Sequence, residues 1–161
     1  MTPPGSCDGN KDQKGALAKG GDLAHRLYDA ILDDNRIAAK ALLKEAPFLA
    51  KHGIDEARCE TKLPHWIYVQ DTMLHAAAAG HRVEIVKMLL EAGANPNDAL
   101  NHRSSQPLHY AADGFVSGES WDGKRQVETI RLLLDAGAAI DGQDKNGATP
   151  LHRAVRTRCA G

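Results

Sequence analysis

The chain of 161 residues is poor in aromatic side chains, cysteine and net charge. Aromatics make up 4% of it, so alanine and leucine carry the apolar content, which favours closely packed helices over a β-sandwich or barrel. The formal net charge of −1 argues against a general nucleic-acid binder, which needs a strong basic excess. Its 3 cysteines are far apart and form no CxxC pair, which indicates reduced thiols and a cytoplasmic protein.

Long apolar runs and catalytic signatures are also lacking. No stretch approaches the ~20 apolar residues of a membrane helix, so we expect no membrane association. No GxSxG, P-loop or GxGxxG motif occurs, and the 8 histidines show no HExxH or comparable metal-ligand spacing. Cys59 has His52 and His65 nearby in the sequence, but proximity alone supplies neither an activated thiolate nor an orienting third group. We therefore expect no enzyme activity, no metal and no cofactor.

What the chain does contain is a repeat. Three versions of one tetrapeptide occur, Thr-Met-Leu-His at 72–75, Gln-Pro-Leu-His at 106–109 and Thr-Pro-Leu-His at 149–152. The first two are each followed by a second shared block with helical spacing that ends in Ala-Gly-Ala, at 83–94 and 127–138. The second interval between tetrapeptides holds about ten residues more than a ~33-residue period requires. Such self-similarity predicts stacked helix hairpins, because one hairpin cannot bury its apolar face alone.

Each part of the repeat has a local physical role. Threonine at an N-cap accepts from an unpaired backbone N–H, and proline at the first helical position has its φ already set. Gly93 and Gly137 follow the second shared block, where a glycine takes a left-handed φ and ends the helix. Before the repeats, Asp22 is a plausible N-cap for a first helical pattern, and a second pattern ends before Pro47.

These residues resemble the ankyrin repeat, most fully over Gly137–His152, which matches the family's pattern without a gap. The resemblance implies an all-α ankyrin-repeat solenoid of stacked helix-turn-helix units, with β-turn fingers and a concave face made by fingers and first helices. It also implies that the recurring histidines hydrogen-bond within and between repeats. The chain departs from the pattern at Gln70 and Ser104, which replace the turn glycine, so we expect those two finger tips to be reshaped. Met73 and Gln106 replace the usual proline and threonine.

The expected domain organisation follows from these patterns. Residues 1–20 are predicted to be a disordered tail, and residues 21–161 an ankyrin repeat domain. Within that domain we expect an N-terminal cap repeat (21–50), a long loop (51–70), a repeat (71–103), a repeat with an insertion at 114–125 (104–145) and a partial repeat (146–161). Long loops without structure of their own are uncommon and are often functional.

The resemblance and the loops together predict non-catalytic protein–protein recognition, through the concave face and the two enlarged loops. Exposed aromatics and arginine are the usual anchors of such interfaces. The candidate partner-binding residues are Trp66, Tyr68, Asn101, His102, Arg103, Tyr110, Asp113, Phe115, Trp121 and Arg125. The alternatives are that each tryptophan packs its loop onto the stack, and that the finger at 100–105 is an ordinary solvated turn.

Other functions stay open at this point. The chain could be the targeting module of a larger enzyme or effector whose catalytic part lies elsewhere. A weaker hypothesis is a small-molecule pocket with enzymatic activity, lined by Cys59, His65 and Trp66. The last segment lacks a partner helix, so we expect either a monomer that is a piece of a longer repeat protein or self-association through this C-terminal edge. The partner itself is not named by the sequence.

Overall fold

The computed structural model describes residues 11–59, 62–63, 65–114 and 121–158. Its helices are α1 (Lys11–Leu32), α2 (Arg36–Glu45), the 3-10 helix η1 (Pro47–Lys51), α3 (Met73–Ala79), α4 (Val83–Glu91), α5 (Pro107–Ala112), α6 (Gly123–Asp135) and α7 (Pro150–Arg158). Two short strands, β1 (Arg58–Cys59) and β2 (Trp66–Ile67), form an antiparallel pair. The predicted all-α solenoid is confirmed, with this strand pair added in the long loop.

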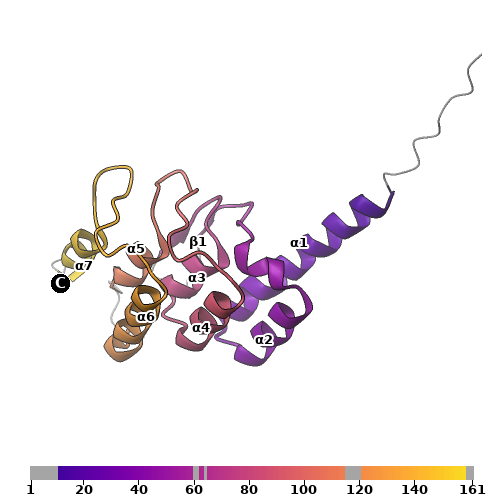
Figure 1. Cartoon of the computed structure of the whole chain (residues 1–161), viewed down its shortest axis with the longest axis horizontal. Coiled ribbons are helices and arrows are strands. Elements are labelled where there is room, and N and C mark those ends of the chain that lie inside the picture. The colour runs from indigo at the N-terminus through magenta and orange to yellow at the C-terminus, as the bar shows by residue number, and fades with distance from the viewer. Residues whose placement is uncertain (1–10, 60–61, 64, 115–120, 159–161) are drawn as a thin grey trace, which may run out of the picture.

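The helices form two layers. Helices α1, α3, α5 and α7 pack in succession against one another, and α2, α4 and α6 form a second row beside them (Figure 1). The finger loops project from the opposite side of the first row (Figure 1). A continuous apolar core runs through the stack, from Leu27 and Ile31 in α1 to Leu133 in α6. Full burial of one such side chain stabilises the fold by about 1.5–3 kcal/mol.

The N-terminal helix is longer than the sequence pattern predicts. Helix α1 begins at Lys11, so Asp22 lies inside it rather than at its cap. The expectation of a disordered tail is therefore not met over residues 11–20, and residues 1–10 lie outside the described residues. Gly20 and Gly21 each weaken a helix by roughly 1 kcal/mol relative to alanine, but they impose no steric stop as proline does. The alanine, leucine and lysine residues around them favour continuation of the helix.

The predicted helix ends are found where glycine stands. Gly93 and Gly137 both have a φ of 92°, the left-handed conformation that follows α4 and α6. Helix α6 begins at Gly123, before the shared block at 127–138, because Asp122 acts as an N-cap and accepts from the backbone N–H groups of Lys124 and Arg125. The capping residue therefore extends the helix beyond the part that the repeat pattern indicates.

The fingers keep one backbone geometry despite their different sequences. We call the loop between α4 and α5 the first finger and the loop between α6 and α7 the second, and treat the turn at Gln70 as part of the long loop. In the first finger, the side-chain oxygen of Asn101 accepts from the backbone N–H groups of Arg103 and Ser105. In the second, Asp144 does the same for the residues two and four positions later. Gln70 and Ser104 have φ values of 71° and 51°, on the same side of the Ramachandran map as Gly147 at 78°. The expected reshaping is thus wrong for this torsion. At Ser104, the two bonds to the Asn101 side chain hold a non-glycine residue in a conformation that such residues rarely adopt.

Candidate partner-binding surface

The long loop presents Trp66 on the outer face of a small hairpin. In the β1–β2 pair, Arg58 lies opposite Ile67 and Cys59 lies opposite Trp66. Successive strand residues point to opposite faces, so Ile67 enters the core with no exposed area while 53% of Trp66 remains exposed. Leu63 is also buried and holds the same loop. Because these apolar residues already hold the loop, this geometry favours Trp66 as an exposed contact over Trp66 as a plug.

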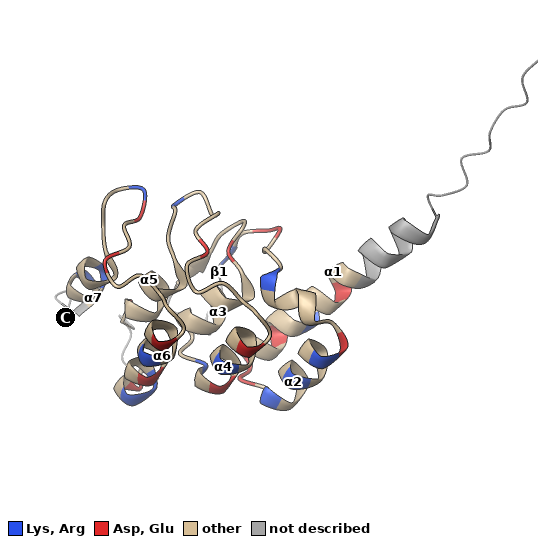
Figure 2. Ribbon diagram, viewed as in Figure 1, with Lys and Arg blue, Asp and Glu red and all other residues tan. Residues whose placement is uncertain are grey.

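Tyr68 brings the long loop into contact with the first finger. The Arg103 Nη1 donates to the Tyr68 hydroxyl at 2.9 Å, and the guanidinium lies 5.2 Å from the centre of the tyrosine ring. His102 packs edge-on against the same ring at 4.9 Å. We call Trp66, Tyr68, His102 and Arg103 the finger patch. Figure 2 shows charges of both signs along α2, α4 and α6, so charge alone marks no comparable surface on those helices in this view.

Three predicted contact residues are buried instead of exposed, namely Asn101, Tyr110 and Asp113. The Asn101 side chain accepts the two backbone hydrogen bonds that hold its finger turn. The Tyr110 hydroxyl donates to Asp71 Oδ2 at 2.7 Å, and burial followed by the nearby Asp71 charge raises the tyrosine pKa. We correct the prediction for these three residues, because their side chains are buried within the stack.

Asp113 belongs to a buried charged cluster that the sequence did not reveal. His65 Nε2 lies 2.5 Å from Asp113 Oδ2, and Arg153 Nη1 lies 3.4 Å from the same oxygen. Arg153 Nη2 reaches Asp144 Oδ2 at 3.0 Å and Ser105 Oγ at 2.7 Å. The cluster joins the long loop, the end of α5, both fingers and α7. It therefore fixes the relative positions of the loops that carry the finger patch.

The pKa directions agree with ionised carboxylates in this cluster. Burial by itself raises the pKa of Asp113, but the hydrogen bond and charge of His65, with the charge of Arg153, hold it below its usual range. Burial likewise acts against ionisation of Asp144, and the Arg153 hydrogen bond together with two backbone N–H donors lowers its pKa. Removing one member would leave an uncompensated buried charge, which costs far more than the pair itself contributes.

The recurring histidines are framework residues in the interior repeats. His75 Nδ1 accepts from the Thr72 backbone N–H at 3.0 Å, so its proton is on Nε2, which donates to Ser105 O at 2.9 Å. His109 repeats this arrangement with the Gln106 N–H and the Ala148 carbonyl. Burial lowers the pKa of both rings, which keeps them neutral. Each histidine thus links its own helix start to the next finger.

The candidate residues in and beside the insertion, Phe115, Trp121 and Arg125, lie outside the finger patch. Phe115 lies outside the described residues. Trp121 is 43% exposed, but its Nε1 donates to Gln126 Oε1 at 3.0 Å, and Gln126 in turn donates to the Ala111 carbonyl. Arg125 pairs with Asp34 at 2.6 Å on the turn between α1 and α2. The Trp121 and Gln126 bonds lie within the α5–α6 hairpin, and the Arg125 ion pair joins this hairpin to the α1–α2 turn, so both side chains already have a partner within the chain.

Two wider features of the described residues bear on the site. Within the described ranges, no three histidine, cysteine, aspartate or glutamate side chains gather in a way that could hold a metal ion. None of the helices in the same ranges is long and apolar enough to cross a membrane.

His65 Nδ1 lies 2.9 Å from the Trp66 carbonyl and its Nε2 contacts Asp113, so neither nitrogen is left to activate a nearby thiol.

Comparison with known proteins identifies the repeats. A family model described as ankyrin repeats (many copies) matches residues 74–114 and 123–158. The transient receptor potential cation channel subfamily V member 5 of Rattus norvegicus is 35% identical over 144 residues, which cover 87% of this chain and 18% of that protein. Glycerophosphocholine phosphodiesterase gde1 of Schizosaccharomyces pombe is 38% identical over 87 residues, covering 53% and 7%. Ankyrin repeat domain-containing protein 53 of Macaca fascicularis is 33% identical over 85 residues, covering 53% and 16%. The chain spans less than a fifth of the length of these relatives.

Proposed function

Because the chain belongs to the ankyrin repeat family, whose repeats indicate a protein-interaction module, we propose that it binds a protein partner, without catalysis, through the finger patch. The patch joins the finger that contains His102 and Arg103 to the enlarged first loop, which is the part that departs from a regular repeat. Trp121 and Arg125 are secondary candidates, since each already has a partner within the chain.

The contact of Tyr68 with Arg103 is the observation that supports this proposal most. Tryptophan, tyrosine and arginine are the residue types that dominate binding energy at protein interfaces. Here a half-buried tyrosine orders an arginine from a different loop before any partner arrives. Side chains that are already ordered lose less conformational entropy on binding, so the patch is prepared for recognition.

The test is quantitative affinity capture from the source cells with the wild-type chain, Trp66→Ala and Arg103→Ala. We expect at least one protein to be captured by the wild type and reduced about tenfold or more by either substitution, as for interface hot spots. Lys87→Ala is the matched control, because Lys87 is exposed on α4, away from the fingers. A set of captured proteins that is the same for all four chains would contradict the proposal.

A second candidate function is a targeting module within a larger protein. The supporting observation is the length of the relatives, which include a cation channel and a phosphodiesterase. The intact mass of the native protein in its source cells tests this, because a mass well above 17.3 kDa is expected. Cytoplasmic location stays a prediction and can be checked in the same cells by microscopy.

Self-association through the C-terminal edge is a separate proposal about the assembly. Leu151 and Val155 of α7 are exposed, whereas Arg153 of the same helix is buried in the charged cluster. Exposed apolar residues on a helix mark a contact surface when they adjoin one another. Light scattering at increasing concentration should show a dimer that Leu151→Glu abolishes, and a monomer at all concentrations would contradict this proposal.

A further inference from the structure

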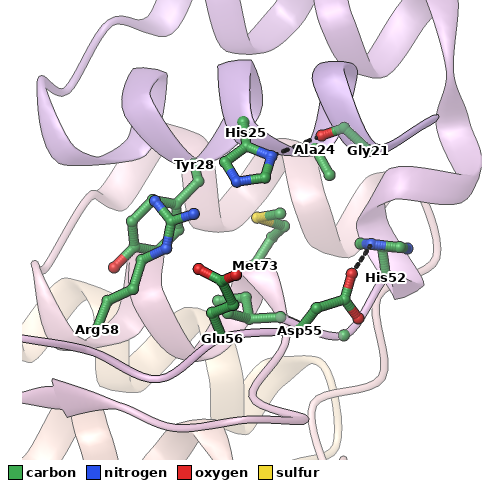
Figure 3. A pocket seen from close by; sticks show the side chains of 11 residues that line it. Gly21, Ala24, His25, Tyr28, His52, Asp55, Glu56, Arg58 and Met73 are labelled. Carbon is green, nitrogen blue, oxygen red and sulfur yellow. Dashed lines mark hydrogen bonds and ion pairs between the residues drawn. The ribbon is translucent and has the colours of Figure 1, made fainter. Parts of the chain in front are cut away.

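A pocket lies between α1 and the segment that leads into β1, away from the finger patch (Figure 3). Its volume is about 150 Å³, and its apolar floor is formed by Ala24, Ile54 and Met73, which are all buried. A cavity of roughly 150 Å³ has room for a benzene-sized group. The pocket is therefore large enough for one apolar side chain and too small for a drug-sized molecule.

The rim of this pocket carries charges that other described residues do not neutralise. No ion pair joins Glu56 or Arg58 to another residue in the described part of the chain. The Arg58 guanidinium lies 5.0 Å from the centre of the Tyr28 ring, at one end of the pocket. The Glu56 carboxylate lies beside Met73 and points toward the pocket, on the side opposite His25 (Figure 3). A further carboxylate, Asp55, lies 4.0 Å from His52 and is largely exposed.

The pocket and the finger patch use opposite faces of the same hairpin. Arg58 lines the pocket and lies opposite Ile67, whose side chain enters the core. Trp66 is the next residue along the strand and points to the other face. A substitution at Trp66 should therefore leave the pocket intact, so the two surfaces can be tested independently.

We propose that this pocket receives a single apolar side chain of a partner polypeptide, next to a basic residue that pairs with Glu56. This inference rests on the proposed function and adds the chemistry of the partner. The apolar floor provides the burial that anchors such a residue, and the rim holds two carboxylates, Asp55 and Glu56, against one arginine, Arg58. The charge balance at the mouth thus favours a cationic neighbour over an anionic one.

The probes are three capped dipeptides, acetyl-Leu-Lys-amide, acetyl-Leu-Glu-amide and acetyl-Ala-Lys-amide, titrated into the isotope-labelled full chain and followed by NMR. We expect saturable shifts at Ala24, Ile54 and the Met73 methyl with the Leu-Lys probe, with a dissociation constant in the millimolar range. Leu-Glu should bind at least about threefold more weakly, and Ala-Lys should not saturate, because it lacks the group that fills the pocket.

Two variants test the assignment without removing core residues. Glu56→Gln should abolish the difference between Leu-Lys and Leu-Glu while leaving the pocket open. Gly21→Leu should block all probes, because Gly21 lines the pocket and a Cβ placed there meets no atom within 4 Å. Gly20→Ala is its control, since it also removes a helix glycine but its Cβ meets only the edge of the Phe48 ring at 4.0 Å. Trp66→Ala should bind the probes as the wild type does.

Three results would overturn this inference. They are the absence of saturable shifts with any leucine probe, equal affinity for Leu-Lys and Leu-Glu, and isoamylamine binding as tightly as Leu-Lys, which would indicate a small-molecule site. If the pocket binds none of the probes but capture of a protein still depends on Trp66, the proposed function stands and only this inference fails. If the pocket binds the probes as expected but capture of no protein depends on the finger patch, this inference stands and the proposed function fails.

Discussion

The interior repeats and the last repeat begin with nearly the same tetrapeptide, yet its residues lie in different environments. Leu74 and Leu108 are 0% and 2% exposed, whereas Leu151 is 71% exposed. His75 and His109 bond to the next finger, while His152 bonds only within its own helix start among the described residues. The motif therefore sets a helix start everywhere, but its contribution to stability depends on the repeat that packs onto it.

The largest expected difference concerns these leucines. Leu74→Ala and Leu108→Ala should each lower the free energy of unfolding by about 2–5 kcal/mol, because each leaves a cavity in the core. Leu151→Ala should change it by less than about 0.5 kcal/mol, since an exposed side chain leaves no cavity. Urea denaturation followed by circular dichroism measures all three. Equal losses at Leu108 and Leu151 would show that α7 is covered in solution, which would also support self-association.

Acidification should lower the stability of the folded chain through its buried histidines. Burial lowers the pKa of His75, His81 and His109 in the folded chain, so they stay neutral there while the unfolded chain takes up protons near pH 6.5. Stability is therefore complete above that pH and is lost as the pH falls through it, by at most about 1.4 kcal/mol per pH unit for each ring. A second loss follows below about pH 4, where Asp113 and Asp144 become protonated first in the unfolded chain.

Urea denaturation at pH 7.5, 6.5 and 5.5 measures the histidine contribution. His109→Gln should reduce the loss between pH 7.5 and 5.5, because one ring with a lowered pKa is removed. His152→Gln serves as the matched substitution at the exposed repeat position. A wild-type chain that is equally stable at all three pH values would contradict the buried neutral state of His75 and His109.

The sequence predicted the framework and missed most of what positions the surface. Repeat spacing predicted the helices and the glycine ends, and the resemblance to the ankyrin repeat implied the hydrogen-bonding histidines. All of these depend on residues within one repeat and its neighbour. The cluster of His65, Asp113 and Arg153 joins residues up to 88 positions apart. No local period relates them, so only the folded stack brings them together.

The candidate contact residues show the same limit. Tyr68 and Arg103 are 35 positions apart and meet because the long loop lies against the first finger. The residue type of Tyr110 favours a surface contact, but its place in the motif, next to the framework histidine, fits the buried position that the structure shows. Asn101 and Asp144 hold the same place before successive finger turns, a correspondence that was visible in the aligned repeats and predicts turn cradles rather than partner contacts.

The smallest expected change in the free energy of unfolding comes from substitutions at the turns of the two fingers. Ser104→Gly should raise the free energy of unfolding by a few tenths to about 1 kcal/mol, because it relieves a left-handed φ that costs serine roughly 1–2 kcal/mol and is offset in part by glycine's larger unfolded-state entropy. Gly147→Ala is the reverse test and should lower it by about 1 kcal/mol through the backbone alone, since a Cβ at Gly147 meets no atom within 4 Å. Thermal and urea denaturation measure both changes. If Ser104→Gly destabilises the chain, the serine side chain contributes an interaction that outweighs its backbone strain, and the two fingers are not equivalent in energy despite their shared geometry.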